Sequence, residues 1–129
     1  MKIQESTEDY LERILILHKE LEQVRAIDIA RSMNYSKPTI SIALKKLREN
    51  GNVTVDRSGN VTLTEQGLAV AQKTYEKHTV IADLLMRLGV SKKTACEDSC
   101  HIEHCLSDES FEAIKSCLKE HPELSGSEG

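Results

Sequence analysis

The sequence predicts a mainly α-helical protein, in which an N-terminal winged helix-turn-helix with a two-stranded wing is followed by an all-helical domain. Apolar residues recur at helical spacing up to residue 50, alternate with polar residues between residues 53 and 63, and return to helical spacing up to residue 119. This order of elements is typical of a winged helix-turn-helix, in which a helix, a short helix, a three-residue turn and a further helix precede a β-hairpin.

The first helix is expected from Ser6 to about Leu21, with Ser6 as its N-terminal cap. Its broad apolar face consists of Leu11, Ile14, Leu15, Leu17, His18 and Leu21. A short second helix is expected over Ala26–Met33. Its buried positions should be Ile27, Ala30 and Met33.

A third helix should begin after Ser36, which can cap it, with Pro38 in the first turn. Asn50, followed by a glycine, is a natural end for this helix. The side of the helix that faces the core should consist of Ile40, Ala43, Leu44 and Leu47.

A β-hairpin should follow, with residues 56–60 as its glycine-containing loop. The apolar residues of its two strands are Val53, Val55, Val61 and Leu63. Thr64 can then cap a long helix from Glu65 to about Leu88, which Gly89 would end.

Two further helices are expected at about 92–106 and 108–119. We therefore predict a winged helix-turn-helix domain over residues 1–73 and a helical domain over 74–121. The polar tail, 122–129, should be disordered.

Charge is divided unevenly along the chain, although the net charge is only −4. Residues 25–57 carry seven Lys or Arg against three acids, a balance of +4, whereas residues 91–129 carry four basic and nine acidic residues, a balance of −5. A basic middle segment is suited to a polyanion, which acidic flanks would repel. Ordinary scatter of surface charge would look similar.

The solvent-facing side of the third helix is suited to reading double-stranded DNA. Thr39 and Ser41 can offer hydroxyl groups to base edges or phosphates, and Ile42 can contact a thymine methyl group. Lysines later in the helix, and Arg57 at the hairpin tip, would contact the DNA backbone. The predicted DNA-binding residues are Ser36, Lys37, Pro38, Thr39, Ser41, Ile42, Lys45, Lys46 and Arg57. A solvated helix face would have a similar composition, and some winged helices bind protein.

The segment from Cys96 to His104 carries side chains that can bind metal. At about 100° per residue, Cys96, Cys100, Glu103 and His104 fall within an arc of about 80° on one helix face. The opposite side should pack through Ala95, Ile102 and Leu106. The alternative is a polar helix face with two buried structural cysteines.

One helix face supplies three or four ligands at most, so other ligands should come from elsewhere. Asp9 and Glu12 lie three residues apart on the first helix, and His78 lies inside the long helix. Acidic residues in a first turn also stabilise the helix dipole, and a single histidine is more often structural than a metal ligand.

The chain from Thr7 to Lys119 resembles the diphtheria-toxin-repressor/manganese-transport-regulator (DtxR/MntR) family, and five segments carry the resemblance. They are Ser-Thr-Glu-Asp-Tyr-Leu-Glu at 6–12, Ser-Lys-Pro-Thr-Ile-Ser at 36–41, Leu-Thr-Glu-Gln-Gly at 63–67, Lys-His at 77–78 and Ile-Glu-His-Cys-Leu-Ser at 102–107. The resemblance implies a homodimeric repressor that binds operator DNA when loaded with Fe(II) or Mn(II). It also implies a helical metal-binding and dimerisation domain, as in the short members without an SH3-like domain.

The resemblance implies a set of six metal ligands from both domains. They are Asp9, Glu12, His78, Cys100, Glu103 and His104. Metal would tie the first helix to the helical domain and fix the spacing of the two recognition helices on half-sites one DNA turn apart. Cys96 stands where the iron branch has a second-site ligand, but Ala82 stands where that branch has Glu. Cys96 is therefore expected to serve only a second, incomplete site.

Two positions bear on which metal binds. The manganese branch of the family has an acidic residue where Cys100 stands, and the iron branch has Met where Asp9 stands. A thiolate disfavours Mn(II) relative to Fe(II), Co(II) or Zn(II), whereas carboxylates suit harder ions. We therefore expect a divalent transition metal, with Fe(II) favoured and Mn(II) next, and Zn(II) or Co(II) binding in vitro. Cys105 and Cys117 are expected to be thiols without a metal role.

Three other functions remain open from the residues alone. Cys96, Cys100 and Cys105 could form an iron–sulfur or redox sensor, although Cys105 points about 140° away from Cys100 on a helix. A metalloenzyme is disfavoured because no phosphate-binding loop or nucleophile motif accompanies the ligands, so neither catalysis nor a small organic substrate is expected. A metal-free protein-interaction module would bind neither metal nor DNA.

Neither a signal peptide nor an apolar run of the ~20 residues that a membrane helix needs is found in the sequence. We therefore expect a cytoplasmic protein without a membrane partner. Its four cysteines should be reduced, which favours metal chemistry over a disulfide framework.

Overall fold

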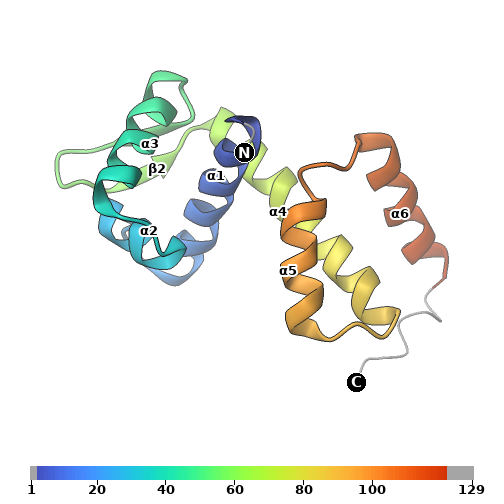
Figure 1. Ribbon diagram of the computed structural model, residues 1–129. Coiled ribbons are helices and arrows are strands. Elements are labelled where there is room, and N and C mark those ends of the chain that lie inside the picture. Colours follow the sequence, from blue (N-terminus) through green and yellow to red (C-terminus); the bar gives the residue numbers. More distant parts are fainter. Residues whose placement is uncertain (1–2, 122–129) are drawn as a thin grey trace. The chain divides into compact units, whose positions relative to one another are not determined.

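The computed structural model describes the backbone of residues 3–121 and the side chains of residues 7–121, so the expected disordered tail lies outside the described residues. Six helices and one two-stranded antiparallel sheet make up this part of the chain (Figure 1). The predicted fold class, mainly α with a winged helix-turn-helix, is confirmed. The chain divides into two compact units, residues 1–73 and 74–129. None of the described helices has the length and apolar character needed to span a bilayer.

The first unit packs three helices and the hairpin around one apolar core (Figure 1). Its elements are α1 (Ile3–Glu20), α2 (Ala26–Met33), α3 (Lys37–Glu49), β1 (Val53–Val55) and β2 (Val61–Leu63). The start of α4 completes the core, to which it contributes Ala71. The other buried core residues are Leu11, Ile14, Leu17, Val24, Ile29, Ala30, Ile40, Leu44, Leu47, Val53 and Val61.

Two details of the first helices differ from the prediction. Helix α1 already begins at Ile3, so Ser6 lies inside the helix and is not its cap. In α2, Ile29 is buried, whereas Ile27 is 37% exposed. These two isoleucines point about 200° apart on a helix, so only one of them can face the core. Periodicity alone did not distinguish which one.

Helix α3 begins and ends as the sequence predicts. The Ser36 side chain accepts a hydrogen bond from the Thr39 backbone N–H at 3.3 Å, and Pro38 lies in the first turn. The chain leaves the helix after Asn50 through Gly51, whose φ of +80° favours glycine. Ile42 is 61% exposed, on the side away from the buried face.

The hairpin loop is closed by a side chain. Asp56 Oδ1 accepts hydrogen bonds from the backbone N–H groups of Ser58 and Asn60, each at 2.9 Å. The strands pair Val53 with Leu63 and Val55 with Val61. This arrangement leaves Arg57 exposed in the loop between them.

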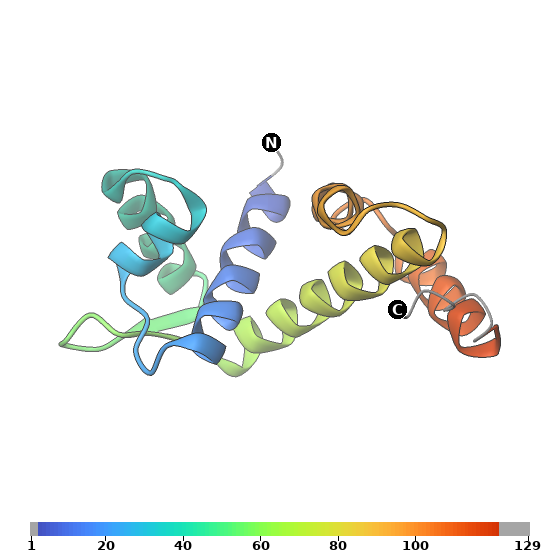
Figure 2. The ribbon, with the colours of Figure 1, turned by 90° about the horizontal axis from the view of Figure 1, so that it is seen from below.

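The second unit consists of the later part of α4 (Glu65–Arg87), α5 (Lys92–Ile102) and α6 (Asp108–Glu120), as Figure 2 shows. Its most buried apolar residues are Ile81, Ala82, Ala95, Phe111 and Leu118. Gly89, with a φ of +102°, follows the end of α4 as predicted.

Helix α5 ends earlier than predicted, at Ile102 instead of residue 106. The N–H of Cys105 bonds to the Ile102 carbonyl at 2.9 Å, a three-residue spacing that tightens the chain into a turn. Ser107 then caps α6 by accepting from the Ser110 N–H. As a result Ile102 is 38% exposed and is not the packing residue that we predicted, whereas Ala95 is fully buried.

Candidate metal centre and nucleic-acid interface

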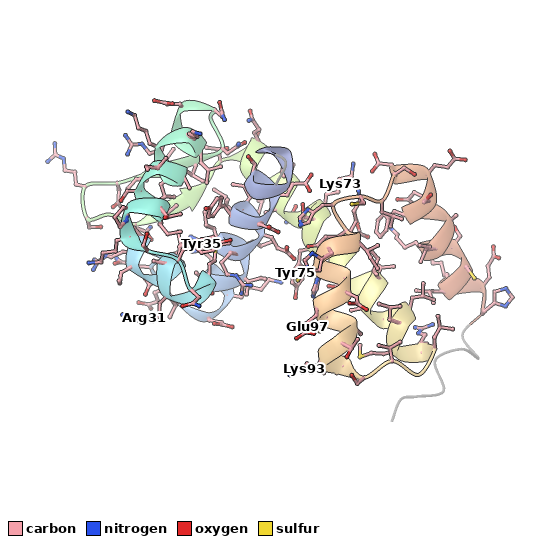
Figure 3. The ribbon with its side chains drawn as sticks, in the orientation of Figure 1. Arg31, Tyr35, Lys73, Tyr75, Lys93 and Glu97 are labelled. Carbon is pink, nitrogen blue, oxygen red and sulfur yellow. The ribbon has the colours of Figure 1, made fainter. Side chains whose placement is uncertain are left out.

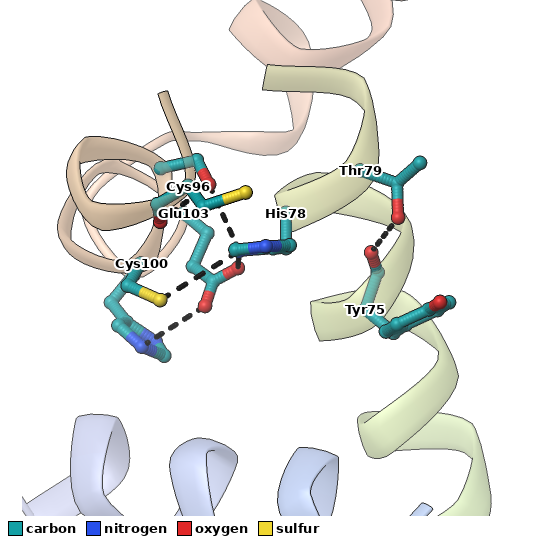
Figure 4. Close-up of polar contacts among 8 residues, drawn as sticks. Tyr75, His78, Thr79, Cys96, Cys100 and Glu103 are labelled. Atoms are coloured by element: carbon teal, nitrogen blue, oxygen red, sulfur yellow. Dashed lines mark hydrogen bonds and ion pairs between the residues drawn. The ribbon is translucent and has the colours of Figure 1, made fainter. Parts of the chain in front are cut away.

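Four of the predicted metal ligands lie in the second unit. His78 is in the middle of α4, and Cys100 is in the last turns of α5. Glu103 is the C-terminal cap of α5, and His104 lies in the turn that follows. Figure 4 shows His78, Cys100 and Glu103 gathered between α4 and the end of α5.

Nδ1 of His78 is the centre of the contacts. It lies 3.4 Å from Glu103 Oε1 and 3.8 Å from Cys100 Sγ. The other carboxylate oxygen, Oε2, is 3.5 Å from Nε2 of His104. The ligand atoms of His78, Cys100 and Glu103 all lie within 4.8 Å of one another, a spacing at which a single ion can contact all three.

The Glu103 carboxylate lacks hydrogen-bond donors. Its side chain is 0% exposed, and neither oxygen has a hydrogen-bond partner within the described part of the chain. Burying an ionised carboxylate is costly unless a charge or donors compensate it. A bound cation would supply that compensation, and a set of thiolate, imidazole and carboxylate suits a divalent transition metal. The residues present therefore fit the metal that the resemblance implies.

The environment of His78 favours its protonated form. The polar contact with Cys100 and the neighbouring Glu103 carboxylate raise the pKa of His78 from 6.5 to about 11, although burial opposes them. Without metal, the imidazolium thus balances the buried carboxylate. A metal ion that binds His78 would have to replace this proton.

Cys96 is not part of this group, although it lies one helical turn before Cys100. No group of metal-ligating side chains within the described residues contains Cys96. The geometry offers no support for Cys96 as a second-site ligand.

An iron–sulfur centre would need several thiolates around one cluster. Within the described residues, each group of metal-ligating side chains contains at most one cysteine. Cys105 and Cys117 are exposed free thiols. The redox-cluster alternative therefore has no geometric support in this part of the chain.

Two residues near the centre were given no role from sequence. Ser99, fully buried on α5, places its hydroxyl 2.9 Å from His78 Nδ1. Lys77 donates a hydrogen bond to the Leu106 carbonyl at 3.1 Å and so ties the turn after α5 to α4. Lys77 belongs to the Lys-His segment at 77–78 that carries part of the family resemblance, whereas a serine within a helix has no distinctive spacing.

The remaining predicted ligands, Asp9 and Glu12, belong to the first unit. They lie three residues apart on α1, a spacing that puts them on the same side of the helix. Each of them takes part in at least one polar interaction.

The predicted DNA-binding residues also belong to the first unit. They are Ser36, Lys37, Pro38, Thr39, Ser41, Ile42, Lys45, Lys46 and Arg57, and all of them are exposed. Figure 1 shows α3 and the hairpin that carry them in this unit.

A cleft of about 340 Å³ in the first unit is lined by residues of α3 and the hairpin, among them Lys37, Ser41 and Gly59. Arg25, immediately before α2, also lines this cleft, and it was not among the predicted DNA-binding residues. The only sequence signal for Arg25 was its place in the basic segment 25–57. It brings a second cation, beside Lys37, to a cleft whose remaining lining is mostly apolar.

Comparisons with known proteins identify both halves of the chain. Residues 2–61 match the iron-dependent repressor N-terminal DNA-binding domain, and residues 64–124 match the iron-dependent repressor metal-binding and dimerisation domain. An uncharacterised HTH-type transcriptional regulator of Methanocaldococcus jannaschii is 38% identical over 113 residues, which cover 86% of this chain and 90% of that protein. This chain belongs to the DtxR/MntR family.

Two further relatives agree. The transcriptional regulator MntR of Escherichia coli O157:H7 is 32% identical over 117 residues, 91% of this chain and 76% of that protein. A solved manganese-dependent transcriptional repressor in complex with manganese superposes with a TM-score of 0.81 at 27% identity. That match covers 88% of this chain and 52% of the solved one, so the chain spans about half the length of that protein.

Family membership confirms the function predicted from the residues. The protein is a metal-dependent transcriptional regulator with a DNA-binding half and a metal-binding and dimerisation half. Both relatives, of Methanocaldococcus jannaschii and Escherichia coli, are named as transcriptional regulators.

Proposed function

We propose that this protein represses transcription from operator DNA as a homodimer when a divalent transition metal binds ligands contributed by both of its halves. The proposed ligands are Asp9, Glu12, His78, Cys100, Glu103 and His104. The observation that carries the proposal is the buried Glu103 carboxylate, which has His78, His104 and Cys100 around it and no hydrogen-bond donor among the described residues. Such a group is more readily explained as a metal ligand than as a structural ion pair.

The metal would act as a strong positive charge that draws ligands from two parts of the chain together. Asp9 and Glu12 present carboxylates from α1, the first helix of the DNA-binding half. Because α1 packs against the rest of that half through Leu11, Ile14 and Leu17, restraining α1 restrains α3 as well. Metal binding would thus favour the arrangement in which both recognition helices of a dimer meet half-sites about 34 Å apart.

We propose Fe(II) as the preferred metal, with Mn(II) next. The argument is the Cys100 thiol, which a softer ion than Mn(II) binds better. The names of the relatives favour Mn(II) instead, since one is called MntR and the solved repressor is in complex with manganese. Zn(II) and Co(II) are expected to bind in vitro through the same thiolate and imidazoles.

The exposed side chains of α3 support direct contact between this helix and DNA. Thr39 and Ser41 present hydroxyl groups to base edges or phosphates, and Ile42 presents an exposed apolar side chain suited to a thymine methyl. Lys45, Lys46 and Arg57 would neutralise phosphates.

An anaerobic titration tests the proposal. Fe(II), Mn(II), Co(II) and Zn(II) are added in turn to the full chain while its binding to the DNA upstream of its own gene is followed by fluorescence anisotropy. We expect DNA affinity to rise between about five- and 150-fold with metal, the usual size of an allosteric coupling. Equal DNA affinity with and without every metal would exclude the metal-dependent switch. A lower half-saturating concentration for Mn(II) than for Fe(II) would overturn only the metal preference.

A further inference from the structure

Ser99 forms a hydrogen bond with Nδ1 of His78, the ring nitrogen that lies closest to the other candidate metal ligands. Its side chain is fully buried on α5, and its Oγ lies 2.9 Å from His78 Nδ1 and 3.2 Å from the Cys96 backbone carbonyl. A hydroxyl group has one proton, and a carbonyl oxygen can only accept. Ser99 therefore donates to Cys96 and accepts from the N–H at Nδ1 of His78.

Nδ1 of His78 also lies close to the candidate ligands Cys100 and Glu103. Nδ1 lies 3.4 Å from Glu103 Oε1 and 3.8 Å from Cys100 Sγ. An imidazole nitrogen has a single direction in the ring plane for a proton or a metal ion. The hydrogen bond to Ser99 and coordination of a metal through Nδ1 are therefore mutually exclusive.

We infer that Ser99 competes with the metal for His78 Nδ1 and so sets the metal concentration at which the regulator switches. The inference rests on the proposed function, and it concerns a residue that is not itself a ligand. Ser99 acts through His78: in the metal-free protein its hydroxyl occupies the hydrogen-bonding direction of Nδ1, with Cys100 and Glu103 close by, and metal binding must break that bond. The hydroxyl stabilises only the metal-free state.

Removing the Ser99 hydroxyl should raise metal affinity if Ser99 competes with the metal, and should lower it if Ser99 only orients the His78 ring for binding. Ser99→Ala removes a hydrogen bond that only the metal-free protein makes, so we expect metal affinity to rise about three- to tenfold, the worth of one net hydrogen bond. Ser99→Thr keeps the hydroxyl and should bind metal as the unchanged protein does. Ser116→Ala, the same change at an exposed position of α6, is the matched control.

Affinity is measured anaerobically with Co(II), whose thiolate absorption reports binding without DNA. A second measurement needs no metal: ¹⁵N-labelled histidine should show a slowly exchanging Nδ1 proton on His78 in the unchanged protein and the Thr variant, and a faster one in Ser99→Ala. A higher affinity in Ser99→Ala together with this faster exchange supports the inference.

Unchanged or weaker Co(II) binding in Ser99→Ala overturns the competition and leaves the proposed function intact. If the unchanged protein binds none of the four metals, the proposed function fails, and the inference fails with it.

Discussion

His78 and Glu103 form an ion pair across two elements of the second unit, with Nδ1 and Oε1 3.4 Å apart. One residue lies within α4 and the other caps α5. The carboxylate is fully buried and neither oxygen accepts a hydrogen bond within the described residues. A buried pair with so few supporting hydrogen bonds contributes little to stability by itself. Its geometry is better explained by a ligand that binds both partners.

Replacing the carboxylate tests this explanation. Glu103→Gln keeps the size of the side chain and removes its charge, so we expect Co(II) affinity to fall more than about a hundredfold, because loss of an outer-shell partner alone costs ten- to a hundredfold. The variant should remain folded by circular dichroism and should still sediment as a dimer. Glu97→Gln, at an exposed position of α5 shown in Figure 3, is the control and should bind Co(II) normally. Retained Co(II) affinity in Glu103→Gln would exclude Glu103 as a ligand.

The pH dependence of metal binding follows from His78. Its pKa is raised from 6.5 to about 11, so the imidazolium stabilises the metal-free protein fully below about pH 6.5, and this contribution is lost as the pH rises through about 11. Metal must displace the proton, so binding at neutral pH should release at least one proton per ion. Co(II) affinity should rise by about tenfold or more per pH unit between pH 6.5 and 8.

Calorimetry in two buffers of different ionisation enthalpy counts the released protons. His78→Gln should lower Co(II) affinity and remove one proton from the count. His101→Ala, at an exposed histidine of α5, should change neither. The same proton release in His78→Gln as in the unchanged protein would contradict the role given to His78.

Helical spacing predicted much of the second unit but not the end of α5. We placed Cys96, Cys100, Glu103 and His104 on one continuous helix, yet the helix ends at Ile102. Glu103 keeps a helical backbone conformation, with φ −58° and ψ −29°, so its predicted direction is nearly preserved although its place in a helix is not.

Other features depend on tertiary contacts that no local pattern contains. Ile27 and Ile29 fit helical spacing equally well, and only packing against the other helices buries Ile29. The contact of Ser99 with His78 joins residues 21 positions apart on different helices. Motifs and residue spacing could therefore predict which residues are candidate metal ligands. The hydrogen bonds that orient these side chains depend on the fold and could not be predicted from the sequence. The ligand and DNA-contact assignments themselves stay predictions until they are measured.

Metal preference should change with the residue at position 100. Cys100→Glu replaces the thiol, exposed at the end of α5, by a harder oxygen ligand, so we expect Mn(II) affinity to rise relative to Fe(II) and Co(II). Competition between Mn(II) and Co(II) measures the change in ratio, which should be tenfold or more. Cys105→Ser, which alters an exposed thiol two residues beyond Glu103, is the control and should keep the original order of metals. An unchanged order in Cys100→Glu would show that Cys100 does not determine selectivity.

The wing arginine should contribute to DNA binding through charge alone. Arg57 is exposed in a loop that Asp56 holds closed through hydrogen bonds to Ser58 and Asn60, so Arg57→Ala should leave the hairpin intact. Loss of one phosphate contact should lower the slope of log affinity against log salt concentration by about 0.9 and weaken binding to all DNA sequences alike.

Anisotropy titrations between about 50 and 200 mM salt, with metal present, give this slope on operator and unrelated DNA. Lys93→Ala, at an exposed position of α5 labelled in Figure 3, removes the same charge from the other unit and should leave the slope unchanged. If both variants lower the slope equally, the effect comes from net charge and not from a contact of the wing. If Arg57→Ala weakens binding to the operator only, Arg57 reads bases and the phosphate role is wrong.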